Sequence, residues 1–323
     1  MEIYLIGLAV ALVGGLLMSR LTRLLHLPAV TAYLVAGLLL GPFFLGRLNV
    51  PGLGFNTLEE VNVLSIVSQT ALGFIAFAMG NEFRLSQLRT IGSRAIIIGI
   101  LQAVITTIVV DVILLLLHLF FPHIISVPCA ITLGAIAAAT APAATLMVVR
   151  QYKADGPMTR LLMLVVALDD AVGLLLFSVS FGIATALSNG QVSVLAVVVE
   201  PIVEILLSVG LGGFMGLLLH WVERFFHSRS KRMSLSVAFV MLTVGLSMLE
   251  FQIGPVHCGF SLLLVCMMTG TIFCNVCPTS EELMERVDGW TMPLNILFFV
   301  ISGAELDLNV LSQPVTLIVG IIY

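Results

Sequence analysis

The stretch LLMLVVALDDAVGLLLF, residues 161–177, places two adjacent acids, Asp169 and Asp170, in a run that holds no other charged residue. An ionised carboxylate at the centre of a bilayer costs about 2.5–3.5 kcal/mol on insertion scales. Two neighbouring acids there imply bound protons, a bound cation or a basic partner. A carboxylate that trades a proton for a cation is the chemistry of an ion-coupled transporter.

The composition places this stretch in a membrane protein. Hydrophobic residues make up 59% of the 323 and charged residues 10%, and the mean hydropathy is +1.16. These values lie far outside the range of soluble chains. We therefore expect an all-α polytopic protein embedded in a lipid bilayer. The net charge of −4 suggests no nucleic-acid partner.

The five cysteines are Cys129, Cys258, Cys266, Cys274 and Cys277, and they lie mostly in or beside apolar segments. They are therefore expected to be small core residues rather than a disulfide framework. The Cys274-x-x-Cys277 spacing is able to bind metal or do redox work. The sequence offers no second cysteine pair and no nearby histidine to complete a site, so we expect no cofactor there.

Apolar runs of about 20 residues predict ten full helices. They are expected near residues 2–24, 30–46, 62–81, 92–120, 127–149, 159–187, 195–221, 233–253, 257–276 and 290–303. An eleventh begins at Pro314 and is still running at Tyr323. The expectation is a C-terminally incomplete domain from a longer protein.

The charges of the loops orient these helices, because Lys and Arg favour the cytoplasmic side. Of the fourteen basic residues, only Arg47 lies in a loop on the opposite side. The N-terminus is therefore expected outside the cell. The acidic stretch 281–288 falls on the cytoplasmic side, where we expect a solvated loop.

An internal repeat is visible in two short segments. GNEFRL, residues 80–85, ends the predicted third helix, and GAELDL, residues 303–308, ends the tenth. These helices end on opposite sides of the membrane, so the repeat is inverted. Inverted repeats with binding sites near the bilayer midplane are a recurrent plan among transporters.

The paired acids lie deep in the membrane. Asp169 is about eleven residues beyond the Gly156-Pro157 breaker, or roughly 17 Å at 1.5 Å per residue, close to the middle of a core about 30 Å thick. Adjacent helical residues point about 100° apart, so one carboxylate is expected to bind and the other to tune it. The alternative is a pair satisfied by neighbouring helices, without a transport role.

The predicted fifth helix carries GAIAAATAPAAT, residues 134–145, near the middle of its span. Proline frees a backbone carbonyl one turn earlier, and small residues allow close backbone approach. A helix broken at Thr140, Ala141 and Pro142 would supply carbonyls for a cation beside the aspartates. A simple proline kink is the alternative. Gln102 and Asp111, in the fourth helix, are weaker polar signals.

The order of motifs resembles a known family. LPAVTAYLVAGLLLGP (27–42), Gly80-x-Glu82, TAP (140–142), ALDDA (167–171) and FFVISGAEL (298–306) are similar to motifs of the monovalent cation/proton antiporter superfamily, the sodium/hydrogen exchanger fold. The paired aspartates resemble the branch that includes NapA, NhaA and the Kef systems, rather than the Asn-Asp branch of electroneutral exchangers.

The resemblance implies an inverted-repeat sodium/proton antiporter fold, with one transmembrane cation/proton exchanger domain over residues 1–323. Residues 62–187 and 290–323 would form the mobile transport part, and residues 1–61 and 195–276 the dimer or scaffold part of a homodimer. The two parts would move by elevator-like alternating access.

The same resemblance implies residue roles. Asp170 would be the main carboxylate for Na⁺ or K⁺ and for the proton, with Asp169 as its neighbour. Thr140 would contact the ion from a helix break supported by Ala141 and Pro142. Many relatives have Asp where this chain has Ala141, so the charge balance at the break differs here.

The resulting hypothesis is a secondary active antiporter that exchanges Na⁺ or K⁺ for H⁺ across the plasma membrane of a prokaryote. It is expected to be neither an enzyme nor dependent on a cofactor. The alternatives are a sodium-coupled organic anion symporter of related fold and a channel-like or non-transporting membrane module. The basic partner of the first aspartate in electrogenic relatives would lie beyond Tyr323, which leaves stoichiometry open.

Overall fold

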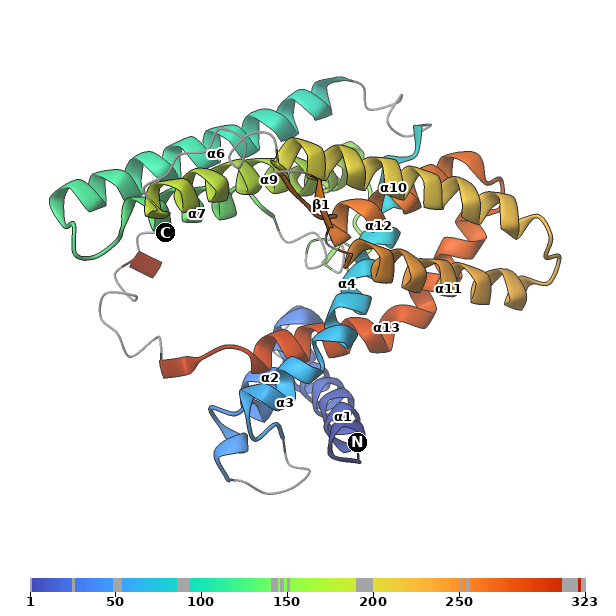
Figure 1. Ribbon diagram of the computed structural model, residues 1–323. Helices are drawn as coiled ribbons and strands as arrows, with labels where there is room; N and C mark the ends of the chain where they lie inside the picture. The colour runs from blue at the N-terminus through green and yellow to red at the C-terminus, as the bar shows by residue number, and fades with distance from the viewer. Residues whose placement is uncertain are drawn as a thin grey trace.

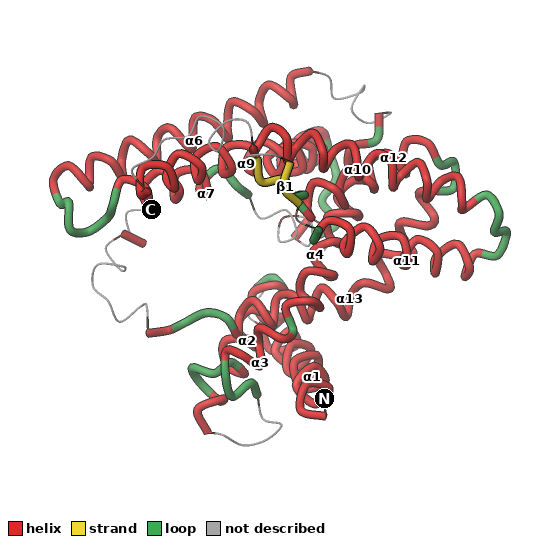
Figure 2. Tube along the Cα trace, in the orientation of Figure 1, coloured by secondary structure: helices red, strands yellow, loops and turns green. Residues whose placement is uncertain are grey.

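The computed structural model describes residues 2–24, 27–48, 54–85, 93–140, 145, 148–149, 152–189, 200–249, 251–253, 256–309 and 319–320. Helices make up nearly all of the described chain, and one short hairpin is present (Figures 1 and 2). The expected fold class, an all-α polytopic membrane protein, is confirmed.

The first half of the chain contains α1 (Glu2–Leu24), α2 (Ala29–Leu40), the 3-10 turn η1 (Leu45–Leu48), α3 (Leu58–Val63), α4 (Ser65–Met79), the 3-10 turn η2 (Gly80–Phe83), α6 (Ser93–Phe120) and α7 (Val127–Ala137). The second half contains α9 (Pro157–Asn189), α10 (Glu200–Glu223), α11 (Arg229–Ser247), β1 (Phe251–Ile253), β2 (Val256–Cys258), α12 (Leu262–Val276) and α13 (Ser280–Ala304). Side-chain caps begin several of them: the hydroxyls of Thr57, Ser126 and Ser261 accept backbone N–H groups of α3, α7 and α12, as free helix N-termini require.

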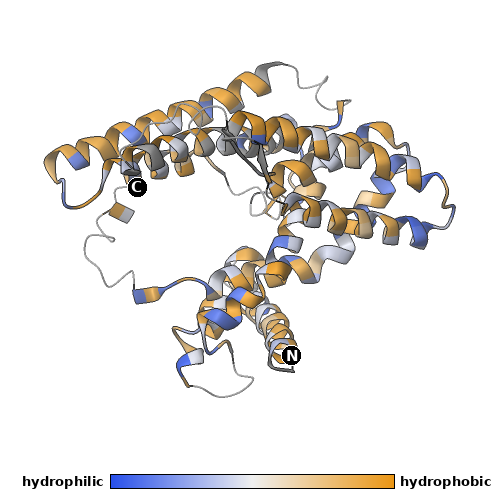
Figure 3. Cartoon of the chain, viewed as in Figure 1, coloured by the Kyte–Doolittle hydropathy of each residue, from blue (hydrophilic) through white to orange (hydrophobic). Residues whose placement is uncertain are grey.

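Five helical segments among the described residues are long and apolar enough to cross a membrane: Tyr4–Thr22, Ala29–Leu48, Ile96–Phe120, Ile202–Glu223 and Ser280–Ala304. Most residues along these helices are apolar (Figure 3), and many of their large apolar side chains are exposed. Leu119 and Phe120, for example, are 71% and 72% exposed. Such surfaces suit contact with lipid.

The helices pack in two connected groups. α6, α7 and α9 contact one another and form the layer across the top of Figure 1. The other group is continuous: α10 packs on α12, α12 on α4, α4 on α13, α13 on α2, and α2 on α1. Phe74, Phe77 and Phe273 are fully buried where α4 meets α12. The division into transport and scaffold parts stays a prediction.

Two helix crossings in the second group are made by glycines. At the α2–α13 crossing, a Cβ on Gly37 would meet the backbone of Val300, and one on Gly303 would meet the backbone of Leu34. At the crossing of α12 with the end of α4, Gly80 and Gly270 approach each other in the same way. Small residues allow such close approach of membrane helices.

The two crossings correspond to each other under the predicted repeat. Gly80 and Gly303 are the first residues of its two matching segments. The third and tenth predicted helices are α4 and α13. The same repeat relates the second helix, α2, to the ninth, α12. The contact of α4 with α12 should therefore have a counterpart in the contact of α13 with α2, and both contacts are present. The inverted repeat itself stays a prediction.

Three predicted boundaries are wrong. The helix expected over 233–253 ends at Ser247, and Phe251–Ile253 pairs as a strand with Val256–Cys258. The helix expected from 257 begins at Leu262, after its Ser261 cap. The helix expected over 30–46 ends at Leu40, because the Gly41-Pro42 pair breaks it.

A further correction concerns the acidic stretch 281–288. It was expected to be a solvated loop, but it forms the beginning of α13, which starts at Ser280 rather than near 290. Glu281 and Glu282 lie in the first turn of this helix. Carboxylates there are favoured by the positive end of the helix dipole, so a polar run that resembles a loop is a helix start.

Candidate ion-binding site

Asp169 lies on α9 where α6, α7 and α9 pack together, and it is fully buried at 0% exposure. The side-chain amide of Gln102, from α6, donates a hydrogen bond to Asp169 Oδ2 over 2.8 Å. Thr140, just beyond the end of α7, faces the same carboxylate. Three segments of the chain therefore meet at one acid.

The end of α7 positions Thr140. The helix begins at the Ser126 cap, with a proline in its first turn, and ends at Ala137. The N–H of Ala138 bonds back to the carbonyls of Ala135 and Ile136, a tightened last turn. Thr140 then continues outside the helix. The last carbonyls of a helix carry partial negative charge, which favours a cation near this end.

α9 packs closely on the segment that follows α7. A Cβ on Gly173, one turn after Asp169, would lie 3.7 Å from the Cα of Ala139. The backbone after α7 therefore runs directly beside α9. This contact keeps Thr140 next to the acid.

Two oxygens of the site have no partner beyond each other. Asp169 Oδ1 and Thr140 Oγ1 are both buried, they face one another, and neither has a further hydrogen-bonding partner among the described residues. Buried polar atoms in folded proteins are nearly always paired. A proton on the carboxylate would give the hydroxyl a donor, and a monovalent cation between the two oxygens would be bound by both. The arrangement is thus able to hold either species.

Not every predicted site residue can be placed. Asp170 lies in α9, but its side chain falls outside the described part of the structure. Ala141 and Pro142 also lie outside the described residues. The structure brings Asp169 and Thr140 together, and the roles of all five residues stay predictions.

Two polar residues of α6 were only weak signals in the sequence. Gln102 is the hydrogen-bonding partner of Asp169. Asp111 points its carboxylate at α7, into the space that a side chain at Gly134 would need. Its Oδ1 is buried without a partner among the described residues. Their position inside an apolar stretch marks both as candidates, but only the structure shows which of them contacts Asp169.

A second cluster of functional side chains lies at the far end of α10. His220, Glu223 and Cys277 are all buried, and their ligand atoms lie within 4.8 Å of one another. No pattern along the chain joins these residues, because no histidine is near Cys277 in the sequence. The fold supplies the histidine from another helix.

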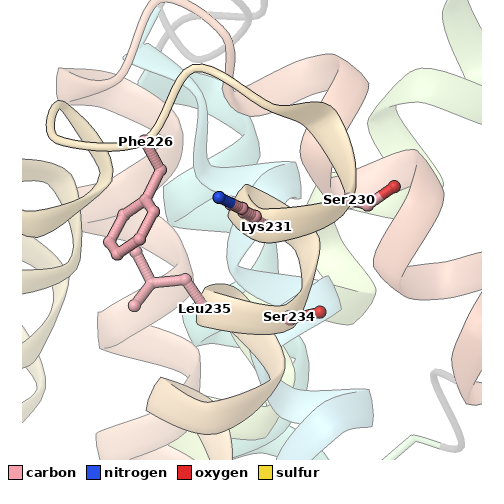
Figure 4. Close-up of a pocket in the computed structure, with 5 residues that line it drawn as sticks. All are labelled: Phe226, Ser230, Lys231, Ser234 and Leu235. Atoms are coloured by element: carbon pink, nitrogen blue, oxygen red, sulfur yellow. The ribbon is translucent and has the colours of Figure 1, made fainter.

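A surface pocket of about 390 Å³ lies beside that cluster, on the turn between α10 and α11. Phe226, Ser230, Lys231, Ser234 and Leu235 line it, all from this turn and the start of α11 (Figure 4). None of the predicted ion-site residues contributes to the pocket.

Comparisons with known proteins agree with this fold. The family model for the transmembrane sodium/hydrogen exchanger matches residues 8–323. A K⁺ efflux antiporter 5 from Arabidopsis thaliana is 31% identical over 94 residues, which cover 29% of this chain and 14% of that protein.

Two structures of the sodium proton antiporter MjNhaP1 from Methanocaldococcus jannaschii are similar in fold. The structure at pH 8 has a TM-score of 0.65 at 20% identity and covers 95% of this chain and 71% of that one. The second, from electron microscopy, has a TM-score of 0.68 at 19% identity, with 93% and 69% covered.

Proposed function

The chain belongs to the sodium/hydrogen exchanger family, and from that premise we propose that it is a secondary active antiporter, exchanging Na⁺ or K⁺ for protons by alternating access. A family of membrane exchangers agrees with the expectation that the chain is not an enzyme. The membership rests on a match over nearly the whole chain. The ions, the residues and the mechanism are the proposal.

One observation supports the proposal: the fully buried Asp169 carboxylate faces the buried Thr140 hydroxyl, and no third group among the described residues occupies the two oxygens that face each other. Asp169 accepts from Gln102 at Oδ2 and leaves Oδ1 toward Thr140. A cation held by the neighbouring Asp170 would need further oxygen ligands, and Asp169 Oδ1 and Thr140 Oγ1 are two available ones.

In the proposed mechanism, Asp170 is the main exchanging carboxylate, and Asp169 and Thr140 are its neighbours. The carboxylate holds either a cation or a proton, because both need the same negative charge. Adjacent acids also titrate as a coupled pair, which spreads their protonation over a wider pH range. Competition for one site then couples the two fluxes, without contact between the two ions.

The proposal covers both Na⁺ and K⁺ as the transported cation. One relative is named for K⁺ efflux and the solved structures for sodium. The proposal also includes a homodimer in the plasma membrane of a prokaryote with the N-terminus outside, as the loop charges predict. The site is built from oxygens, the ligand type that alkali cations prefer.

The test uses the full chain in liposomes with a pH-sensitive dye inside. An imposed pH gradient should dissipate when Na⁺ or K⁺ is added outside, and the Asp170→Asn variant should abolish that response. Asp155→Asn is the matched control, because Asp155 is an exposed acid paired with Arg160 at the surface. Full activity in Asp170→Asn would refute the assignment, and channel-like single-ion currents would refute antiport.

A further inference from the structure

We propose that His220, Glu223 and Cys277 form a binding site for one Zn²⁺ ion, at the end of the molecule where α10 leads into α11 and α12 leads into α13 (right side of Figure 1). His220 and Glu223 lie in the last turn of α10. Cys277 follows the last residue of α12. The site is separate from the proposed ion pathway at Asp169.

The donor set suits zinc. Imidazole nitrogen, carboxylate oxygen and thiolate sulfur are its three common protein ligands, and three protein ligands with one water complete a tetrahedral site. All three side chains are more than nine-tenths buried: His220 is 8%, Glu223 3% and Cys277 3% exposed.

The spacing also suits zinc. Cys277 Sγ and Glu223 Oε2 lie 3.7 Å apart. In a tetrahedral site with Zn–S of about 2.3 Å and Zn–O of about 2.1 Å, those two atoms are separated by about 3.6 Å. The two atoms therefore already have the separation that an ion between them requires. The remaining separations, all within 4.8 Å, need at most a small closure of the His220 ring.

The glutamate is arranged to hold a metal with one oxygen. Glu223 Oε1 forms an ion pair with Arg232 Nε at 2.9 Å and accepts a hydrogen bond from the Thr279 hydroxyl at 3.1 Å. Oε2 has only the Cys277 thiol as its partner among the described contacts. Arg232 and Thr279 hold the carboxylate in place and leave Oε2 directed at the sulfur, as hydrogen-bonding partners of ligand side chains do in metal sites.

The histidine needs one rearrangement. Arg224 contacts His220 Nε2 at 2.9 Å, while His220 Nδ1 is buried and has no partner among the described residues. An arginine only donates, so it must leave Nε2 whichever ring nitrogen binds the metal. Arg224 is exposed and able to turn into solvent. Zinc binding would also displace the thiol proton of Cys277 to solvent, as thiolate ligation requires.

The test measures Zn²⁺ bound at equilibrium to the full purified chain in detergent, prepared without a histidine tag. We expect one Zn²⁺ per chain. His220→Ala and Cys277→Ser should each weaken binding by at least about 10- to 100-fold. Arg224→Ala should bind as tightly as the unmodified chain or more tightly.

Cys274→Ser is the matched control. It removes the other thiol of the CxxC pair, whose sulfur contacts the carbonyls of Gly80 and Thr271 rather than the cluster. Its zinc binding should be unchanged. Equal loss in this variant and in Cys277→Ser would assign the metal to the cysteine pair and overturn the proposed site.

A second measurement does not depend on folding of the variants. Co²⁺ added to the unmodified protein should give the charge-transfer absorption of a thiolate–cobalt bond, and Zn²⁺ should abolish it. Stoichiometric Co²⁺ binding without that absorption, or no saturable binding of either metal, would overturn the proposal. Neither result affects the antiport proposal, because transport is not the readout.

Discussion

The glycine crossing of α2 and α13 makes a quantitative prediction for Gly37→Ala. A Cβ at this position would overlap the carbonyl oxygen of Val300, its nearest neighbour, and would lie 2.8 Å from the carbonyl carbon of the same residue. Carbon atoms in ordinary contact are about 3.5–4.0 Å apart. The two helix backbones must therefore separate by at least about 1 Å, since both neighbours are backbone atoms that cannot turn away.

The expected loss of stability follows from this separation. Overpacking of this kind costs about 1–3 kcal/mol, and a backbone-on-backbone contact belongs at the upper end. Alanine has a higher helix propensity than glycine, which offsets about 1 kcal/mol of this loss. The net loss is about 2 kcal/mol, or a melting temperature lower by about 4–8 °C at the ~2–4 °C per kcal/mol found for domains of 150–250 residues.

Thermal unfolding of the purified protein in one detergent is a direct assay. Gly213→Ala, in α10, is the matched control: no atom lies within 4 Å of a Cβ there, so this variant should gain up to about 1 kcal/mol. Gly303→Ala should resemble Gly37→Ala. The double variant should lose less than the sum, because one separation relieves both overlaps. A melting temperature of Gly37→Ala equal to or above that of the unmodified protein would refute the close approach.

Three further predictions concern polar contacts. Thr140→Val should lower the apparent cation affinity in the liposome assay but reduce the melting temperature only slightly, since Asp169 is the single partner of this hydroxyl among the described residues. Gln102→Leu should lower the free energy of unfolding by about 1–3 kcal/mol, because Asp169 Oδ2 loses its donor, and an unchanged denaturant midpoint would contradict that. Arg232→Gln should cost about 2–3 kcal/mol by the same measurement, because Glu223 is buried and loses its cation.

The Arg232→Gln prediction has its own control in the same region. Arg286 pairs with Glu282 at 3.0 Å, but both side chains are well exposed. Arg286→Gln should therefore cost no more than about 0.5 kcal/mol. Equal losses in the two variants would show that burial does not decide the strength of these ion pairs.

Much of the helical plan was predictable, because apolar length is a strong constraint in a membrane protein. The predictions failed where polar or strand-forming residues followed other rules. Glu281 and Glu282 look like a loop on a hydropathy scale, but at a helix N-terminus they stabilise the helix. Phe251–Ile253 was counted as the end of one apolar helix and His257 and Cys258 as the start of the next, although β-branched and aromatic residues around the Gly254-Pro255 pair favour a hairpin.

The site was predictable in part. Asp169 and Thr140 stand out because a polar residue inside an apolar helix is costly. Their partner Gln102 does not, because the sequence offers several polar residues in the same helix and no means of choosing its orientation. The proximity of His220 to Cys277 could not be predicted from the sequence, because it depends on how α10 packs against α12 and not on any spacing along the chain.

The glycine crossings also bear on how such a molecule can move. Where backbone touches backbone, no layer of side chains remains to change rotamer and let one helix slide along the other. α2 with α13, and α4 with α12, should therefore each travel as a single rigid strut. Each strut joins a helix of the predicted transport part to a helix of the predicted scaffold part, so the boundary between the moving parts is expected away from the one that the resemblance implies. Sliding motions between packed helices need small side-chain adjustments at the interface, so any shear during transport is expected at the surfaces of the α6–α7–α9 group. Crosslinks within a strut should then leave transport intact, whereas crosslinks between that group and a strut should arrest it.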